Sequence, residues 1–140
     1  MVDRDLVFEK IKNIQNCLKR IRDVTQFNPN SLDDLNIQDI FVLNLQRAVQ
    51  STIDLAAHIV ASEGLGVPEK LKENFTLLEK AKIISPECTK KMMLMVGFRN
   101  IAVHEYQEID IEILKSILIQ HVADIEKFYI DILQFYGLDK

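Results

Sequence analysis

The chain has 140 residues, of which 48% are apolar and 27% are charged, and its formal net charge is −4. This composition predicts one folded domain over residues 1–140 and excludes a disordered chain. The negative charge excludes a broad phosphate-binding surface, so any contact with nucleic acid must come from a local patch. The charged N-terminus lacks a signal peptide, and no segment reaches the ~18 uncharged apolar residues of a membrane span, so we expect a cytoplasmic protein without a membrane partner.

The first half of the chain has the apolar spacing of two long helices. A first amphipathic helix is expected over residues 3–24, and an Asn28-Pro29 turn separates it from a second helix over residues 37–63, which Gly64 and Gly66 end. The core stripe of the second helix is expected to comprise Ile40, Phe41, Leu45, Ala48, Thr52, Leu55, Ala56, Ile59 and Val60.

Sequence patterns typical of helix N-termini divide the second half of the chain into further helices. Pro68 fits the first turn of a third helix, and Asn74-Phe75-Thr76 is a point at which this helix could divide into two parts that need not be collinear. Ser85-Pro86-Glu87 combines a capping hydroxyl, a proline at the first helical position and an acid in the first turn. This pattern predicts a fourth helix over residues 86–104.

Asp110 is well placed to cap a last helix over residues 111–136, which Gly137 ends. Its inward-facing side chains are expected to be Ile113, Ile117, Ile125, Phe128, Ile132 and Phe135. Strand alternation and glycine-rich phosphate loops are absent from the sequence, so Rossmann and P-loop chemistries are excluded. The expected fold is all-α, an antiparallel bundle of four to five helices.

A polar motif, Arg99-Asn100-Ile101-Ala102-Val103-His104-Glu105-Tyr106, lies at the end of the fourth predicted helix. His104 can exchange protons near neutral pH, and the planar Arg99 guanidinium matches phosphate oxygens. These two residues suit RNA cleavage without a metal, in which the 2′-hydroxyl attacks, His104 acts as general base or acid, and Arg99 stabilises charge on phosphorus. Asn100 could bind the same phosphate or orient His104. An Arg and a His at this spacing are also typical of a structural pair or a solvated surface.

The spacing of the motif limits what one copy can do. Five residues of helix rotate a side chain by about 140° and advance it by about 7.5 Å, so Arg99 and His104 do not share a face. The helix could end near His104 and free its imidazole, or a second subunit could supply its own motif across a two-fold axis. Gly97 in this helix costs about 1 kcal/mol relative to Ala, which a close approach by another helix or a ligand would explain. A small residue that only packs explains it equally well.

Five further polar residues are candidates for support. Asp54 and His58 lie four apart on the second helix, a spacing that suits an Asp-His hydrogen bond behind the site or simple packing. Lys91, with its neighbour Lys90, supplies positive potential for an RNA strand or belongs to a charged helix face. Arg47 either contacts RNA or pairs with a nearby acid.

The two cysteines, Cys17 and Cys88, lie far apart and form no Cys-x-x-Cys or Cys/His cluster. This arrangement supports neither a metal site nor a disulfide framework. We therefore expect reduced thiols, no metal and no cofactor.

The motif Arg99 to Tyr106 resembles the Arg-polar-x(3 to 5)-His signature of HEPN ribonucleases, and its Arg-x4-His-x-Tyr form is similar to that of the HepT toxins. The second predicted helix, the segment Gly66-Val67-Pro68-Glu69-Lys70 and the stretch from Phe75 to Gly97 also resemble the family. The resemblance implies a helical bundle that forms a homodimer or a higher even oligomer. In that assembly two motifs would form one metal-independent site for RNA, with tRNA and mRNA both possible, and Arg99 and His104 would be its catalytic residues.

The resemblance also implies a cognate antitoxin, an MntA-like nucleotidyltransferase that uses ATP to transfer AMP onto Tyr106. If the fourth helix continued, Tyr106 would lie seven residues from Arg99 on nearly the same stripe, where an attached nucleotide would add bulk and negative charge. Two alternatives remain beside the toxin. One is a non-catalytic, nucleotide-binding helical partner subunit of a nucleotidyltransferase, and the other is a purely structural dimerisation bundle.

Overall fold

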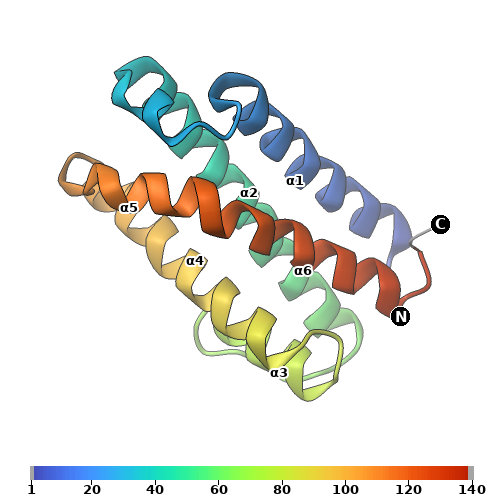
Figure 1. Ribbon diagram of the computed structural model, residues 1–140. Helices are drawn as coiled ribbons and strands as arrows, with labels where there is room; N and C mark the ends of the chain where they lie inside the picture. The colour runs from blue at the N-terminus through green and yellow to red at the C-terminus, as the bar shows by residue number, and fades with distance from the viewer. Residues whose placement is uncertain (1, 139–140) are drawn as a thin grey trace.

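The chain forms an all-α bundle, as expected, in a computed structural model that describes residues 2–138 (Figure 1). Four long helices make up its body, and shorter helical segments connect them. The long helices are α1 (Arg4–Thr25), α2 (Leu35–Ser62), α4 (Pro86–Glu105) and α6 (Val122–Phe135). The shorter segments are η1 (Pro29–Asp33), α3 (Glu73–Lys80), η2 (Tyr106–Glu108), α5 (Ile111–Ser116) and η3 (Ile117–His121). No strand occurs within residues 2–138.

Helix α2 is the central element, because it contacts α1, α3, α4 and α6. Its N-cap Asp34 accepts hydrogen bonds from the backbone N–H of Asn36 and Ile37, so the helix begins two residues earlier than predicted. The expected core stripe is confirmed, since every member is buried except Ile40, which is half-buried. The helix therefore presents one face to the core and leaves its opposite face for polar residues.

The predicted start of the third helix at Pro68 is wrong. Residues 65–72 form a loop, and α3 begins only at Glu73. Gly66 has a φ of +137°, and a Cβ there would lie 3.3 Å from a methyl group of Leu77. The loop therefore packs closely against α3 at Gly66. Pro68 lies in this loop and not in the first turn of a helix.

The last predicted helix is divided in the structure. A π-helical segment, η3, separates α5 from α6, and such a wider turn changes the rotation of the helix before it relative to the helix after it. Two of the predicted inward residues are wrong: Ile113, before this segment, is 51% exposed beside α4, and Phe135, the last residue of α6, is 50% exposed against the ring of Tyr136. The other four, Ile117, Ile125, Phe128 and Ile132, are buried as predicted.

The ends of the bundle are fixed by capping and aromatic packing. Ser85 caps α4 by accepting a hydrogen bond from the N–H of Cys88, and Asp110 caps α5, both as predicted. Phe75 of α3 packs edge-to-face on Phe128 of α6 with 5.5 Å between ring centroids. No helix within residues 2–138 is long and apolar enough to cross a bilayer.

Candidate active site

The motif lies where α4 ends. Glu105, with φ −139° and ψ 37°, leaves the helical region, and Tyr106 begins the short segment η2. The expectation that the helix ends near His104 is therefore confirmed. The side chain of His104 is exposed in the last turn, so its imidazole is accessible to a ligand.

Arg99 does not turn toward His104 but toward α2. Its Nη2 donates to Oε1 of Gln50 at 2.5 Å, and its Nη1 donates to Oδ1 of Asn100 at 2.9 Å. Asn100 thus orients Arg99 rather than His104. Because the two catalytic candidates point in different directions, one chain alone does not assemble an Arg–His pair.

Gln50 extends this contact into a chain of polar side chains. Its Nε2 donates to Oδ1 of Asp54 at 2.9 Å, and Asp54 pairs with Lys10 of α1 at 3.7 Å. The chain runs from α4 across the outer face of α2 to α1. Sequence reasoning missed Gln50, although its position four residues before Asp54 places both on one helix face.

The hydrogen bond between Asp54 and His58, one of the two alternatives for this pair, is not found among the described residues. Asp54 accepts from Gln50, and Nε2 of His58 instead accepts from the backbone N–H of Asp3 at 3.2 Å. The first amides of α1 lack helical partners, and the imidazole satisfies one of them where α1 meets the end of α2. Among the described residues, hydrogen bonds therefore connect Asp54 to Arg99 but do not connect His58 to it.

Lys91 is already paired on the other side of α4. Its ammonium contacts Glu87 at 3.1 Å and Asp124 at 3.4 Å, and the hydrogen bond to Glu87 is the largest cause that raises the pKa of Lys91. Asp124 also contacts Nδ1 of His121 at 2.8 Å. Much of the positive charge of Lys91 is thus compensated within the fold.

Arg47, by contrast, takes part in none of the ion pairs found among residues 2–138. Its exposed side chain lies on α2 at an open hollow of about 380 Å³ between α1 and α2. Gln50, which holds Arg99, lines the same hollow. Pairing of Arg47 with a nearby acid, one of the two alternatives for this residue, is therefore not found.

Tyr106 also reaches α2, but at the start of that helix. Its hydroxyl donates to the carboxylate of Asp39 and lies 3.3 Å from Oε1 of Gln38. Burial, followed by the hydrogen bond to Asp39, raises the pKa of Tyr106 to about 12. Since Gln50 follows Asp39 by eleven residues, the α2 contacts of Arg99 and Tyr106 lie roughly 16 Å apart along the helix. The two side chains thus do not share a stripe, because α4 ends before Tyr106.

An exposed apolar surface lies beside the motif. Leu94 is 62% exposed and Ile101 is 49% exposed on α4, and together with Phe98 and Ile113 they line an open groove of about 410 Å³. Gly97 lies in this surface, and a Cβ on it would meet nothing within 4 Å. Neither packing nor a close approach among the described residues therefore explains the glycine.

Helical geometry places His104 on the same side of α4 as this apolar surface. On an ideal helix His104 is rotated by only about 20° from Gly97, whereas Arg99 is rotated by about 160° from it. His104 therefore borders the apolar surface, and Arg99 faces α2 on the other side of the helix.

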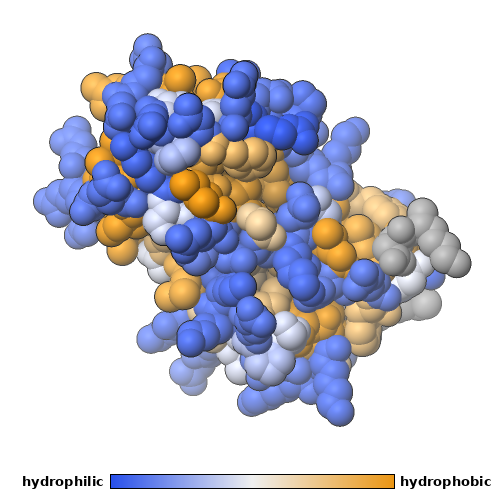
Figure 2. Space-filling view, viewed as in Figure 1, coloured by the Kyte–Doolittle hydropathy of each residue, from blue (hydrophilic) through white to orange (hydrophobic). Residues whose placement is uncertain are grey.

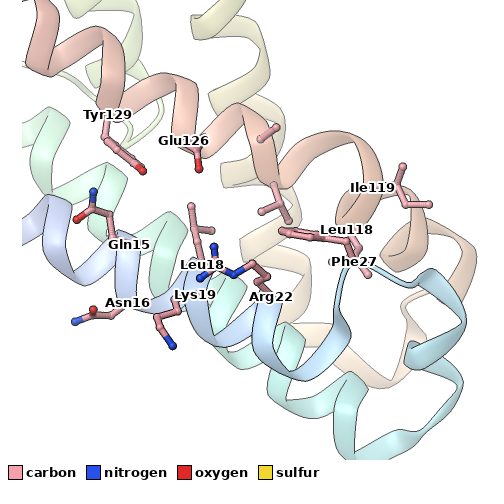
Figure 3. A pocket seen from close by; sticks show the side chains of 12 residues that line it. Gln15, Asn16, Leu18, Lys19, Arg22, Phe27, Leu118, Ile119, Glu126 and Tyr129 are labelled. Carbon is pink, nitrogen blue, oxygen red and sulfur yellow. The ribbon is translucent and has the colours of Figure 1, made fainter. Parts of the chain in front are cut away.

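A second groove, of about 630 Å³, lies between α1 and α6 and has an apolar floor between polar rims (Figure 2). Phe27, Arg22 and Tyr129 are among its lining residues (Figure 3). None of the residues from Arg99 to Tyr106 lines it, so this groove is separate from the motif.

Comparisons with known proteins identify the family of this chain. Residues 14–132 match the family model described as Ribonuclease HepT-like. This chain belongs to the HepT-like ribonuclease family. The match includes the whole motif from Arg99 to Tyr106, and it confirms the family resemblance seen in the sequence.

Two curated relatives carry HepT names. The mRNA nuclease HepT of Shewanella oneidensis (strain MR-1) is 38% identical over 130 residues, which cover 93% of this chain and 97% of the relative. The tRNA nuclease HepT of Aphanizomenon flos-aquae is 38% identical over 66 residues, which cover 47% of this chain and 45% of the relative. The chain is therefore similar to nucleases described for two classes of RNA.

Solved structures share the whole fold. A tri-AMPylated HEPN toxin of Shewanella oneidensis in complex with an MNT antitoxin has a TM-score of 0.87 and 37% identity, with 93% of this chain and 98% of that chain covered. A toxin-antitoxin structure with AMP-PNP has a TM-score of 0.86 and 36% identity, with the same coverage. The cytosolic protein YutE of Bacillus subtilis, at 12% identity and a TM-score of 0.83, covers 97% of this chain and 92% of its own and shows the fold alone.

Proposed function

We propose that this chain is the ribonuclease toxin of a toxin-antitoxin system, which cleaves RNA without a metal at a site shared by two copies. The observation that carries the proposal is the division of the motif on α4. Gln50 holds Arg99 toward α2, whereas helical geometry places His104 on the side of α4 that carries the exposed apolar surface. A second copy packed on that surface would bring its own His104 close to the first, and each copy would contribute the Arg99 that Gln50 holds.

The chemistry follows from the two side chains. A ribose 2′-hydroxyl attacks the adjacent phosphorus while one His104 takes its proton as general base. The 5′-oxygen leaves with a proton from the partner's His104, and a 2′,3′-cyclic phosphate forms. Arg99 stabilises the extra negative charge on phosphorus in the transition state. Two histidines thereby divide the base and acid roles that one chain cannot fill alone.

The polar chain behind Arg99 gives Asp54 an indirect role. Asp54 fixes the amide of Gln50, and Gln50 directs the guanidinium, so Asp54 is a positioning residue for Arg99. We retain Asn100, Arg47 and Lys91 as RNA-binding candidates. The uncompensated charge of Arg47 makes it the strongest of the three, while His58 supports the site only by fixing the start of α1.

We further propose that a nucleotidyltransferase partner in the cytoplasm silences the toxin by attaching AMP to Tyr106. The related toxin solved with an MNT antitoxin is tri-AMPylated, which supports this modification. The phosphate of AMP adds negative charge and bulk close to the end of α4, where it would repel the phosphates of an RNA strand. The RNA itself is either mRNA or tRNA, the two classes found among the relatives.

The proposal is tested with purified protein, labelled mRNA and tRNA, and excess chelator. Wild-type protein is expected to cut RNA and to leave cyclic phosphate ends. His104→Ala and Arg99→Ala are each expected to lose at least a hundredfold in rate, the usual order for the loss of an acid-base group or of a donor that stabilises transition-state charge. Expression in cells should arrest growth only without the partner. If the wild-type protein binds the partner but is as inert toward RNA as His104→Ala, the chain is the non-catalytic subunit instead.

A further inference from the structure

Two side chains of α2 hold the hydroxyl of Tyr106. The phenol donates to the carboxylate of Asp39, and the amide oxygen of Gln38 lies 3.3 Å away as a second acceptor. Asp39 is exposed, and none of the ion pairs found within residues 2–138 includes it. The phenolic proton thus faces a carboxylate that is in no ion pair among the described residues, although Asp39 and Tyr106 lie 67 residues apart in the sequence.

A phenol that attacks phosphorus must lose its proton. In this chain burial and the Asp39 contact raise the pKa of Tyr106 to about 12, so the hydroxyl stays protonated at neutral pH. Transfer of AMP to such a group needs a base within hydrogen-bond reach of the proton. Asp39 meets this requirement before any partner binds.

We infer that Asp39 is the general base for AMP transfer to Tyr106, so that this chain activates its own acceptor and the partner supplies ATP and its binding site. The inference rests on the proposed function. In the transfer, a bond forms between the tyrosine oxygen and the α-phosphorus of ATP, and the bond from that phosphorus to the bridging oxygen of the β-phosphate breaks. Pyrophosphate leaves, and the phenolic proton moves to the Asp39 carboxylate. Gln38 orients the hydroxyl during the attack.

Asp39→Asn separates this role from simple positioning. The asparagine oxygen still accepts a hydrogen bond from Tyr106, but it does not accept a proton at neutral pH. Asp39→Ala removes both abilities. Glu108→Gln is the matched control, because it neutralises an exposed carboxylate two residues from Tyr106 and leaves Asp39 in place.

The measurement is the initial rate of AMP incorporation at Tyr106, followed by mass spectrometry with purified chain, purified nucleotidyltransferase and ATP. Asp39→Asn and Asp39→Ala are both expected to slow transfer by about a hundredfold, while Glu108→Gln keeps the wild-type rate. RNA cleavage and partner affinity of Asp39→Asn should stay within a factor of two or three of wild type. These two readouts show that fold and docking are intact.

The inference is overturned if Asp39→Asn transfers at the wild-type rate, even where Asp39→Ala is slow, because Asp39 would then only position the ring. It is also overturned if Asp39→Asn loses partner affinity in proportion to its rate. If wild-type protein acquires no AMP at Tyr106 at all, the proposed control by modification fails and this inference fails with it. The wild-type arm thus separates the two failures.

Discussion

Gln50 of α2 accepts a hydrogen bond from Arg99 of α4 at 2.5 Å, across 49 residues of sequence. The same amide donates to Asp54, so the arginine is held by a side chain that is itself fixed. Arg99 is half-buried there. Because the guanidinium is planar and held on one side, its remaining N–H groups point in a fixed direction. The contact converts a flexible side chain into a prearranged phosphate ligand.

Removal of this contact should weaken catalysis more than binding. Gln50→Ala frees the Arg99 guanidinium, and a hydrogen bond to a charged group contributes about 1.5–3 kcal/mol, so we expect kcat for RNA cleavage to fall roughly tenfold or more. Gln46→Ala, one turn earlier on α2, is the control and should be near wild type. Equal rates for the two variants in a single-turnover assay would refute the role of Gln50.

Arg47 should act through its charge on the RNA backbone. Arg47→Ala is expected to weaken binding of uncleavable RNA to a similar degree for all sequences and to lower the slope of log affinity against log salt by about one. Lys127→Ala is the control, since Lys127 already pairs with Asp131 at 2.5 Å. An unchanged salt slope in Arg47→Ala would place Arg47 outside the RNA path.

The apolar surface on α4 should be the contact between two copies. Burial of one such side chain contributes about 1.5–3 kcal/mol, so Leu94→Glu and Ile101→Glu are expected to raise the dissociation constant of the dimer at least tenfold and to lower RNA cleavage with it. Val67→Glu changes an exposed apolar residue in the loop before α3 and should do neither. Sedimentation at several concentrations measures the effect, and intact dimers of both α4 variants would count against this surface.

The Tyr106 contact predicts a stability change at high pH. The pKa of Tyr106 is raised in the folded chain from its ordinary value of 10.0 to about 12, so its contribution to stability is complete below pH 10 and is lost as the pH rises toward 12. Tyr106→Phe should therefore lose less stability than wild type between these values. Urea unfolding across that range measures it. The background from Tyr129 and Tyr136, whose pKa values are also raised, is common to both proteins, and parallel curves would argue against a buried phenol.

The long helices could be predicted because their signals are local. Ser85 and Asp110 cap helices as expected, and the core face of α2 repeats at helical spacing. Local signals failed where one sequence pattern is compatible with two structures. Pro68 suits a first helical turn and a loop equally, and the apolar spacing around Ile117 does not distinguish a continuous helix from one with a π-helical turn.

Part of the candidate site could likewise be predicted from local signals, and part could not. Arg99, His104 and Tyr106 could be selected from the sequence because they form one short motif. Their partners Gln50, Asp39 and Gln38 could not, since each lies 49 to 68 residues from the motif residue it contacts. A glutamine or an aspartate on a helix surface looks ordinary until the tertiary fold places α2 against the end of α4.

The most direct test of the shared site combines one active and one inactive chain. A wild-type chain and a His104→Ala chain, co-expressed with different tags and purified as a mixed dimer, hold one intact His104 between them. If the two copies share one site that needs both histidines, the mixed dimer should cleave RNA at least tenfold more slowly than the wild-type dimer. A mixed dimer that keeps half of the wild-type activity would contradict the shared site.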